Sequence, residues 1–551
     1  MKKIYLYILA LSVACLSASA QDLDPTVVVD RVYEGKLMEV HKPVLEMAVP
    51  DTVMRFDLDF DYSVFDNPYK GSYEFNPYLL SMKPSVPSDR SGRFYLRAGA
   101  GYQLRPEFDM VWSPKMKEKG SPFHIDVYAR HRSYFGKYYL LPSDGVIAED
   151  TPALRGGFMK TKAGVDFGAD WDKTAMDVNI GYYGNHRKEF DGFIRNYNAL
   201  DADFSIGSKD MAAPSGFIYG ADVSYRHAFM GGVRENNLSA ELLLGAELKK
   251  DGRFNIEVGF DRDGYSGDGY YGYSVKSGAS LVAVTPHYIY EKGRLYADLG
   301  LKISKVIRDT AYSDFVLDAK EQIVYPDVSL RFSLVRNALM LFARATGGAG
   351  LVSNSDLIER NTFYGLPYTP MGVEVERLNA VAGLEGRFGS RFNWNLHAGY
   401  SNYASGILEA TSPYLVRYMP YSIWNAAFEW LWKSDSFMAD GNVTYRDSWG
   451  SAFRSDVFKP AALTGDVAFE YNYMQRIYVG VNCGFSTART CDAYDCVLPG
   501  YADLGVSAEY VTSRALSFWI KGGNLLGMTI SDNLRYAVKG PYFTLGISLK
   551  L

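Results

Sequence analysis

Three aspartates in one short run have the residue types and spacing of a cation-binding loop. Asp261, Asp263 and Asp268 are interleaved with glycines in the run from 261 to 269. Closely spaced carboxylates are the ligands that Ca²⁺ prefers, and glycine lets a chain wrap tightly around an ion. The run lacks the closing glutamate and the flanking helices of an EF-hand, so the alternative is a glycine- and tyrosine-rich tip of an outer loop. Calcium is therefore the one candidate cofactor, and no other is expected.

Cys491 and Cys496 form a second group with chemistry of its own. They are separated by Asp-Ala-Tyr-Asp, in a segment that we expect to be an outer loop of an exported protein. Disulfides persist in oxidising compartments, so the sequence predicts a disulfide that closes a small loop. Two free thiols are the alternative.

Catalytic motifs do not emerge from the sequence. None of the seven histidines has a metal-ligand spacing to cysteine or to another histidine. There is no G-x-S-x-G nucleophile turn and no phosphate-binding P-loop. We therefore predict no catalytic residues and no enzyme. A hydrolase whose site assembles at one rim of the fold remains an alternative.

The stretch from Lys162 to Tyr182 shows the kind of element that must position these groups. Apolar side chains stand at every second position, with charged or small residues between them. The apolar positions of its first half are Ala163, Val165, Phe167, Ala169 and Trp171. A period of two puts each set on one face of a β-strand. Asp172 and Lys173 are expected to form the tight turn to the next strand.

The same alternation recurs to the C-terminus, in about 22 segments. Short turns, such as 250–252 and 336–337, alternate with long segments that we interpret as loops, at 135–157, 263–275, 307–321, 351–374, 447–460 and 527–539. Tight turns at one end and longer loops at the other are typical of outer-membrane barrels. The sequence therefore predicts an all-β protein, a transmembrane antiparallel β-barrel of about 22 strands with lipid outside and water inside. A tyrosine-rich soluble β-sandwich is the alternative.

Three regions follow from this interpretation. Residues 1–20 resemble a signal peptide, with Lys2 and Lys3 before an apolar stretch and the cleavage motif Ala18-Ser19-Ala20. Residues 21–90 are rich in proline, aspartate and valine, and we expect an extended periplasmic N-terminal arm. Residues 91–551 form the predicted barrel. No later stretch reaches the roughly 18 apolar residues of a membrane helix. The expected location is the bacterial outer membrane.

The charge pattern limits the partners. The chain has a formal net charge of −5 and no basic patch in its sequence, so we expect no nucleic-acid partner. Outer-membrane lipid is the expected partner, and other envelope proteins are candidate partners through the N-terminal arm. Charged residues at lumen positions have mixed signs. They indicate either a cation-selective lining or a wet lumen whose charges neutralise one another.

The end of the chain resembles a known family. Lys521-Gly-Gly-Asn-Leu-Leu-Gly527 and the closing strand Gly540–Leu551 are similar to the end of TonB-dependent receptor barrels. The arm, with Asp24-Pro-Thr26 and Asp59-Phe-Asp-Tyr62, resembles the N-terminal segments of Bacteroidota outer-membrane barrels that lack a plug domain. The resemblance implies a receptor-like uptake barrel.

One segment of the arm looks like a TonB box, the strand that pairs with a periplasmic partner. It consists of Thr26, Val27, Val28 and Val29. The alternative is an ordinary β-prone stretch of the arm.

Two main hypotheses for function remain. The first is a porin-like channel or a receptor-like transport barrel for polar solutes. The second is a structural or assembly subunit of an outer-membrane complex. The rim-site hydrolase is the third and least favoured.

Overall fold

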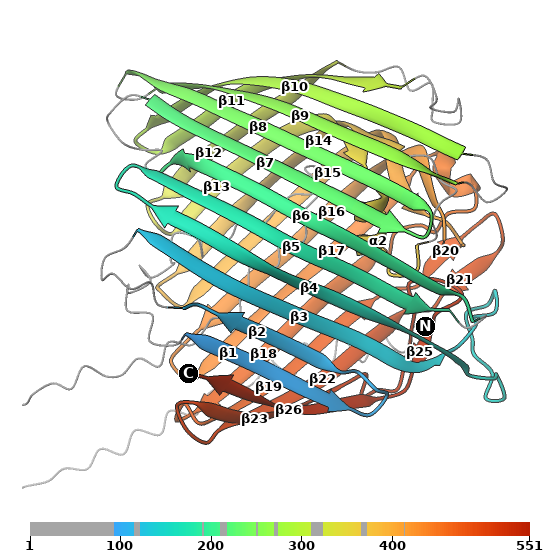
Figure 1. Ribbon diagram of the computed structural model, residues 1–551. Helices are drawn as coiled ribbons and strands as arrows, with labels where there is room; N and C mark the ends of the chain where they lie inside the picture. The colour runs from blue at the N-terminus through green and yellow to red at the C-terminus, as the bar shows by residue number, and fades with distance from the viewer. Residues whose placement is uncertain are drawn as a thin grey trace, which may run out of the picture. The chain divides into compact units, whose positions relative to one another are not determined.

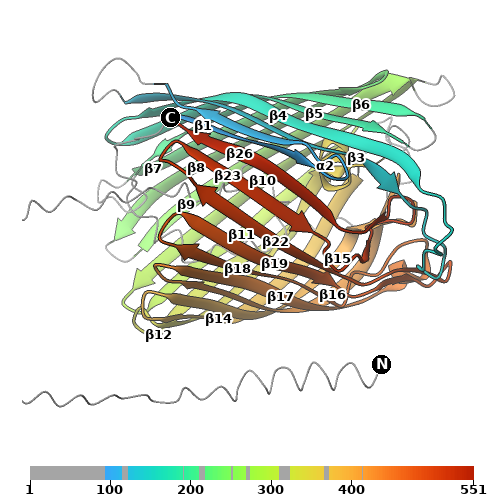
Figure 2. The same cartoon turned by 90° about the horizontal axis from the view of Figure 1, so that it is seen from below.

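The computed structural model describes residues 93–114, 122–189, 192–209, 217–249, 252–268, 274–309, 323–364, 372–412 and 414–551. Their central feature is one antiparallel sheet of 22 strands, tilted around the barrel wall (Figures 1 and 2). The proposed signal peptide, the arm and the TonB-box-like residues Thr26 to Val29 all lie outside the described residues.

The barrel strands in chain order are β1 (Phe94–Gly101), β2 (Glu107–Trp112), β3 (Phe123–Tyr138), β4 (Leu154–Asp170), β5 (Thr174–Lys188), β6 (Ile194–Ser208), β7 (Phe217–Met230), β8 (Val233–Lys249), β9 (Gly252–Asp268), β10 (Ser274–Lys292), β11 (Leu295–Arg308), β12 (Val324–Val335), β13 (Leu339–Val352), β14 (Gly372–Phe388), β15 (Phe392–Glu409), β16 (Val416–Lys433), β17 (Phe437–Trp449), β18 (Leu463–Tyr473), β19 (Ile477–Ser486), β22 (Tyr501–Val511), β23 (Leu516–Gly523) and β26 (Tyr542–Lys550). The smaller elements are the helix α2 (Asn354–Arg360), the 3-10 turn η3 (Ser451–Arg454) and two short ribbons, β20 (Arg489–Cys491) with β21 (Cys496–Leu498) and β24 (Thr529–Ile530) with β25 (Val538–Lys539).

The sheet closes because the first strand pairs with the last. The register of β1 with β26 runs from Tyr95 opposite Lys550 to Gly101 opposite Thr544. Inside this seam, the Trp519 ring of β23 lies where a Cβ on Gly99 or Gly546 would stand, so both positions require glycine. The predicted closed barrel of about 22 strands is confirmed.

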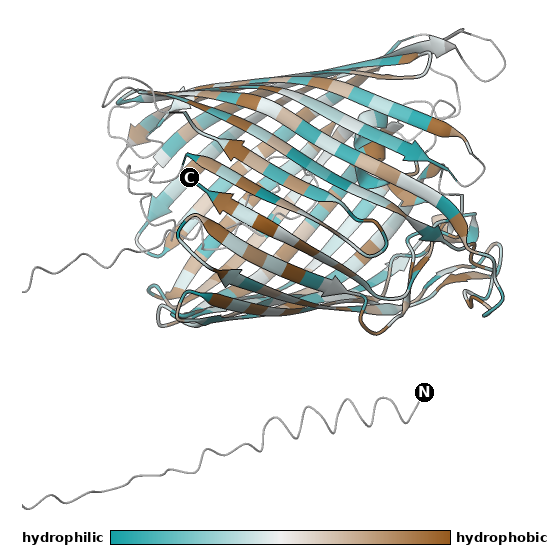
Figure 3. Cartoon of the chain, turned by 60° about the horizontal axis from the view of Figure 1, so that its bottom comes forward, coloured by the Kyte–Doolittle hydropathy of each residue, from teal (hydrophilic) through white to brown (hydrophobic). Residues whose placement is uncertain are grey.

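The two faces of each strand differ as the sequence predicted. Positions expected to face lipid carry exposed apolar side chains, among them Ile180, Leu244 and Leu299, with exposed fractions of 64%, 42% and 49%. Hydrophilic and hydrophobic residues alternate along the strands (Figure 3). A soluble sandwich would bury such a face against a second sheet, whereas here it forms the outside of a barrel. The sandwich alternative is therefore wrong.

Connections differ between the two ends of the barrel. Short turns join β4 to β5, β12 to β13 and β14 to β15, as the sequence predicted. Most long loops lie at the opposite end, again as predicted.

The segment 263–275 is an exception to the loop predictions, because most of it belongs to β9 and β10. The two strands pair as far as Asp268 opposite Ser274. The loop interpretation was wrong because glycines interleaved with polar residues also fit a strand that is hydrogen-bonded on both sides.

Within the described residues, no helix has the length and apolar character needed to cross a bilayer.

The sidedness of the wall predicts the effect of a charge on each face. Leu242 points outward near the middle of β8, and its neighbour Glu241 points into the lumen. We expect Leu242→Arg to lower the free energy of unfolding by about 2–4 kcal/mol, because the guanidinium would face hydrocarbon. Glu241→Arg should cost much less. Urea titration in lipid vesicles measures both, and equal losses would contradict the assigned faces.

Candidate functional site: the lumen and its loop-covered end

One sector of the lumen wall is lined by oxygen-bearing side chains. On β3 to β9, residues directly opposite one another across seven neighbouring strands form a row: Asp126, Asp166, Asn179, Asp203, Ser224, Ser239 and Asp261. Asn179 donates a hydrogen bond to Asp166, and Ser239 Oγ donates to Asp261 Oδ1 at 2.5 Å. Paired strands place such side chains about 5 Å apart, so the row is a continuous polar band.

A second row, one step closer to the turns, adds more carboxylates. Asp177, Asp222 and Glu241 belong to it, with Ser205 between the first two. We call the carboxylates of both rows the acidic wall: Asp126, Asp166, Asp177, Asp203, Asp222, Glu241 and Asp261. Neither row contains a lysine or arginine among its described members. A wall of one charge sign raises the local concentration of counter-ions.

The lumen charges on β22, β23 and β1 to β3 are arranged differently, because they pair with one another. Arg130 lies 3.1 Å from Asp109, and Arg97 lies 3.2 Å from Glu509. Lys521 pairs with Glu107. Of the two hypotheses that the sequence left for the lumen charges, this sector fits the one in which the charges neutralise one another. The cation-selective lining stays a prediction.

Helix α2 packs against the wall at the loop end. Its N-cap is Ser353, whose side chain accepts a hydrogen bond from the Asp356 backbone N–H in a capping box. Leu357 and Ile358 are buried in a cluster with Tyr183, Tyr197 and other inward side chains of β5 to β9. The apolar face of this short helix is therefore covered by side chains of the barrel wall itself.

Charged groups hold α2 in place. Glu359 Oε1 lies 2.9 Å from Arg226, and Glu359 Oε2 lies 3.7 Å from Lys162. At the start of the helix, the Glu235 carboxylate accepts from the backbone N–H groups of Asn354 and Ser355, at 2.8 and 3.1 Å. An anion at a helix N-terminus is favourable. Arg226 and Lys162, on the loop side of the acidic rows, thus pair with a carboxylate of the helix.

A buried carboxylate, Glu189, joins several loops over the lumen. Its side chain accepts from Arg195 at 2.7 Å and from the Tyr414 hydroxyl at 2.9 Å, and Arg187 lies 3.7 Å away. The Tyr414 and Tyr536 hydroxyls are 3.0 Å apart. Glu189 follows β5, whereas Tyr414 precedes β16, about halfway around the ring of strands. Loops from distant parts of the wall must therefore meet across the mouth.

Aromatic rings complete this junction. Phe363, from the segment after α2, stacks on Tyr536 with ring centroids 3.6 Å apart. Tyr138, at the end of β3, packs edge-on against both rings. Burial raises the pKa of Tyr536, and the adjacent Tyr414 hydroxyl raises it further. We call Glu189, Tyr414, Tyr536, Phe363 and Tyr138 the loop junction.

The structure places the residues of the predicted calcium loop in a strand. Asp261 and Asp263 lie in β9, not in an outer loop, and each accepts from a neighbouring strand: Asp261 from Ser239 and Asp263 from Asn237 at 2.8 Å. The described residues contain no group of three or more His, Cys, Asp or Glu side chains arranged to hold a metal ion. Calcium binding that includes Asp268 stays a prediction.

Cys491 and Cys496 stand directly opposite each other in the ribbon of β20 and β21. Both are buried, and both are free thiols in the structure. Burial, with Cys491 adjacent, raises the pKa of the Cys496 thiol to about 11. The disulfide therefore stays a prediction, with the two side chains on paired positions.

Sequence reasoning missed α2 and the loop junction. The run Ser353-Asn-Ser-Asp356 was a usable signal for the helix, because an acidic residue three positions after serine is typical of a helix start. Nothing local identifies Glu189 as the partner of Tyr414, since the two are 225 positions apart.

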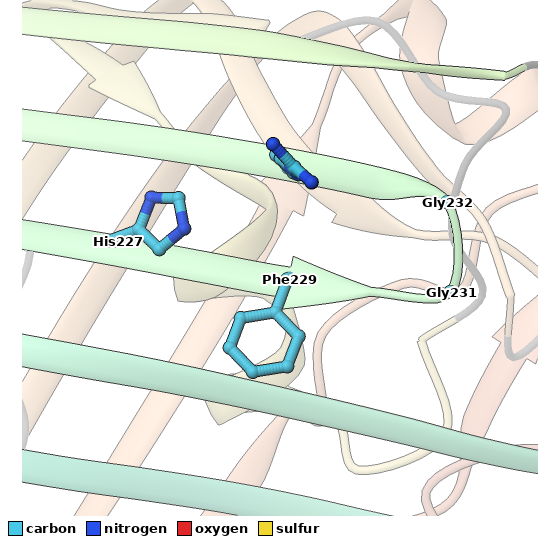
Figure 4. Close-up of a pocket in the computed structure, with 5 residues that line it drawn as sticks. His227, Phe229, Gly231 and Gly232 are labelled. Carbon is cyan, nitrogen blue, oxygen red and sulfur yellow. The ribbon is translucent and has the colours of Figure 1, made fainter.

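A shallow pocket that includes His227 and Phe229 lies on the outer face of the barrel, away from the lumen (Figure 4).

Comparisons with known proteins place the fold. No protein-family model matches the sequence, and a search of curated proteins found no similar sequence. The siderophore receptor PiuA from Acinetobacter baumannii is 10% identical with a TM-score of 0.60, over 84% of this chain and 82% of PiuA. The FrpB iron transporter from Neisseria meningitidis (F3-3 variant) is 10% identical with a TM-score of 0.62, over 83% and 81%. The copper transporter OprC is 12% identical with a TM-score of 0.60, over 84% and 80%.

These similarities extend over most of each chain and define the class of fold. The chain has the fold of an outer-membrane receptor barrel, of the TonB-dependent receptor type that its C-terminal strands resemble. At such low identities the likeness concerns the fold alone.

The loop junction predicts a local opening when its charge is removed. Glu189→Gln leaves the buried Arg187 with a neutral neighbour, and breaking a buried pair costs about 3–5 kcal/mol. We expect trypsin to cleave after Arg535, in the loop of Tyr536, many times faster than in the unaltered protein. Peptide mapping by mass spectrometry measures this. Glu149→Gln, in an exposed loop, is the control, and unchanged protection in Glu189→Gln would contradict the junction.

The cysteine pair has its own test. If the predicted disulfide forms, denatured and unreduced mature protein should take up maleimide at Cys483 but at neither Cys491 nor Cys496. Cys491→Ser should then add labelling at Cys496, because its partner is lost. Intact-protein mass spectrometry reads both. Labelling of all three cysteines without reductant would show that the pair stays reduced.

Proposed function

We propose that the protein is a transport barrel of a bacterial outer membrane, which takes up polar and preferentially cationic solutes through a lumen covered by its own loops. One observation carries this proposal: a closed barrel of 22 strands has an apolar outside and a polar, charged inside. A barrel of this width encloses a lumen that must be filled or gated. The solved neighbours, named as a siderophore receptor, an iron transporter and a copper transporter, support transport as the function.

The charge of the lining supports the preference for cations. The acidic wall has no lysine or arginine in its described rows, and α2 occupies the cations just above it. A solute that passes beside β3 to β9 therefore meets carboxylates. The siderophore, iron and copper in these names are the cargoes of the neighbouring proteins.

We also propose that the protein is not an enzyme, since the neighbours are named as receptors and transporters. The absence of a plug domain, the Bacteroidota-type arm and pairing of Thr26 to Val29 with TonB are part of the same proposal. They concern residues outside those described. The assembly-subunit hypothesis also depends on the arm, and co-purification after gentle detergent extraction tests it.

Planar bilayers test the proposed function. The purified mature protein should conduct, with a reversal potential in a KCl gradient that indicates preference for K⁺ over Cl⁻. We expect the triple variant Asp166→Asn, Asp203→Asn, Asp222→Asn to lose most of that preference, because three charges leave the lumen wall.

The matched control carries Glu149→Gln, Asp172→Asn and Asp435→Asn, which remove the same charge from exposed loops and turns. It should keep the preference of the unaltered protein. Deletion of residues 21–90 distinguishes a channel that the arm blocks from a barrel that forms no channel. The absence of conductance in every form, including the deletion and Glu189→Gln, would overturn the transport proposal.

A further inference from the structure

Four basic side chains lie on the outer face of the barrel near the loop end. Alternation places Lys137 on the same face as Phe135, whose exposed fraction is 41%. Lys137 stands directly opposite Arg155, and Lys188 stands opposite Gly157 on the same face. Arg234 stands opposite the exposed Phe229. We call Lys137, Arg155, Lys188 and Arg234 the basic rim.

A shallow pocket adjoins one end of this rim. It has a volume of about 290 Å³ and is lined by His227, Phe229, Gly231, Gly232 and Arg234. His227 and Phe229 project from neighbouring outward positions of β7 (Figure 4). His227 Nδ1 lies 2.8 Å from Asn236 Oδ1, which holds the ring in place and leaves Nε2 as its second polar atom. The pocket therefore combines an apolar side with a cation and an imidazole.

The charge of the rim is not compensated by the described residues. None of its four members forms an ion pair with a described acidic side chain, although all four are exposed. Arg262, on the same face of β9, behaves differently because its guanidinium lies 2.7 Å from Asp309. Unpaired cations on a surface attract anions, and an arginine fork suits phosphate oxygens in particular.

The rim lies at the edge of the apolar belt. On β7, the outward residues Val223 and Tyr225 are followed by His227, which lies about 14 Å along the strand from Val223. The exposed Phe229 comes next and provides an apolar contact beside this polar group. On β5 and β6, Ile180 and Leu200 are exposed by 64% and 54%. A ligand that fits this surface has hydrocarbon chains for the belt and an anionic headgroup for the rim.

We propose that the basic rim and its pocket bind the phosphate-bearing headgroup of a lipid in the membrane leaflet at the loop end of the barrel. This inference rests on the proposed membrane location. Arg234 and His227 contact the headgroup at the pocket, Lys137, Arg155 and Lys188 attract neighbouring phosphates, and Phe229 packs on the first part of an acyl chain. Lipids held along the rim then cover the outer wall of β3 to β8.

Lipid retention in native mass spectrometry tests this site. The mature full-length protein is reconstituted in nanodiscs of phosphatidylcholine with phosphatidic acid, whose headgroup is a phosphate monoester, and then released from them. We expect phosphatidic acid to be retained in preference to phosphatidylcholine. Arg234→Gln should weaken that retention about fivefold, the effect of one cation near a lipid surface. Lys137→Gln with Arg155→Gln should weaken it further.

Arg336→Gln is the matched control, because Arg336 is an exposed arginine in the turn at the opposite end. It should leave retention unchanged. Equal retention of both lipids, or the same loss in Arg336→Gln, would overturn the inference. Competition by millimolar inorganic phosphate, with no preference for the lipid, would indicate a site for a soluble anion and would also overturn it. A protein that inserts and conducts but retains no lipid defeats this inference alone. One that fails to insert defeats the proposed function as well.

Discussion

The structure depends on one constraint: every backbone N–H and C=O group that faces hydrocarbon must find a partner within the protein. A flat sheet has two unpaired edges, so it meets this requirement only by closing. Here the pairing of β1 with β26 removes both edges, and glycines at the seam make room for Trp519. The backbone bond from Leu551 to Phe94 extends the seam to the last residue. The outside can then be apolar, and the inside can hold charge.

The loops follow from the width that closure imposes. A ring of 22 strands encloses more space than its own side chains fill, and the chain uses that space for α2 and the loop junction. Buried charges are costly unless paired, and Glu189, Glu235 and Glu359 each meet donors from other segments. Acidic groups thus hold the loops in place, while the carboxylates of the acidic wall line the lumen.

The sequence was sufficient to predict the strands of the barrel wall, but not the helix and the loop contacts inside it. Alternation around Val165 and Asp166 identified strands, faces and short turns, because a period of two is a local property. The same rule failed at Asp261 to Asp268, where interleaved glycines fit a loop and a paired strand equally well. The partners of Glu189 are set by closure of the whole ring, which no local pattern encodes. Helix α2 had a local signal at Ser353, but the long segment around it was interpreted as a loop.

The central claim is that lipid lies outside the wall and water inside it. Single cysteines placed at 240 to 245 on β8, in a protein whose own cysteines are replaced by serine, test it most directly in lipid vesicles. A fluorophore at 240, 242 or 244 should be quenched by lipids with brominated chains. One at 241, 243 or 245 should be quenched by a water-soluble agent instead. A signal without this alternation, or with the two sets exchanged, would contradict the account.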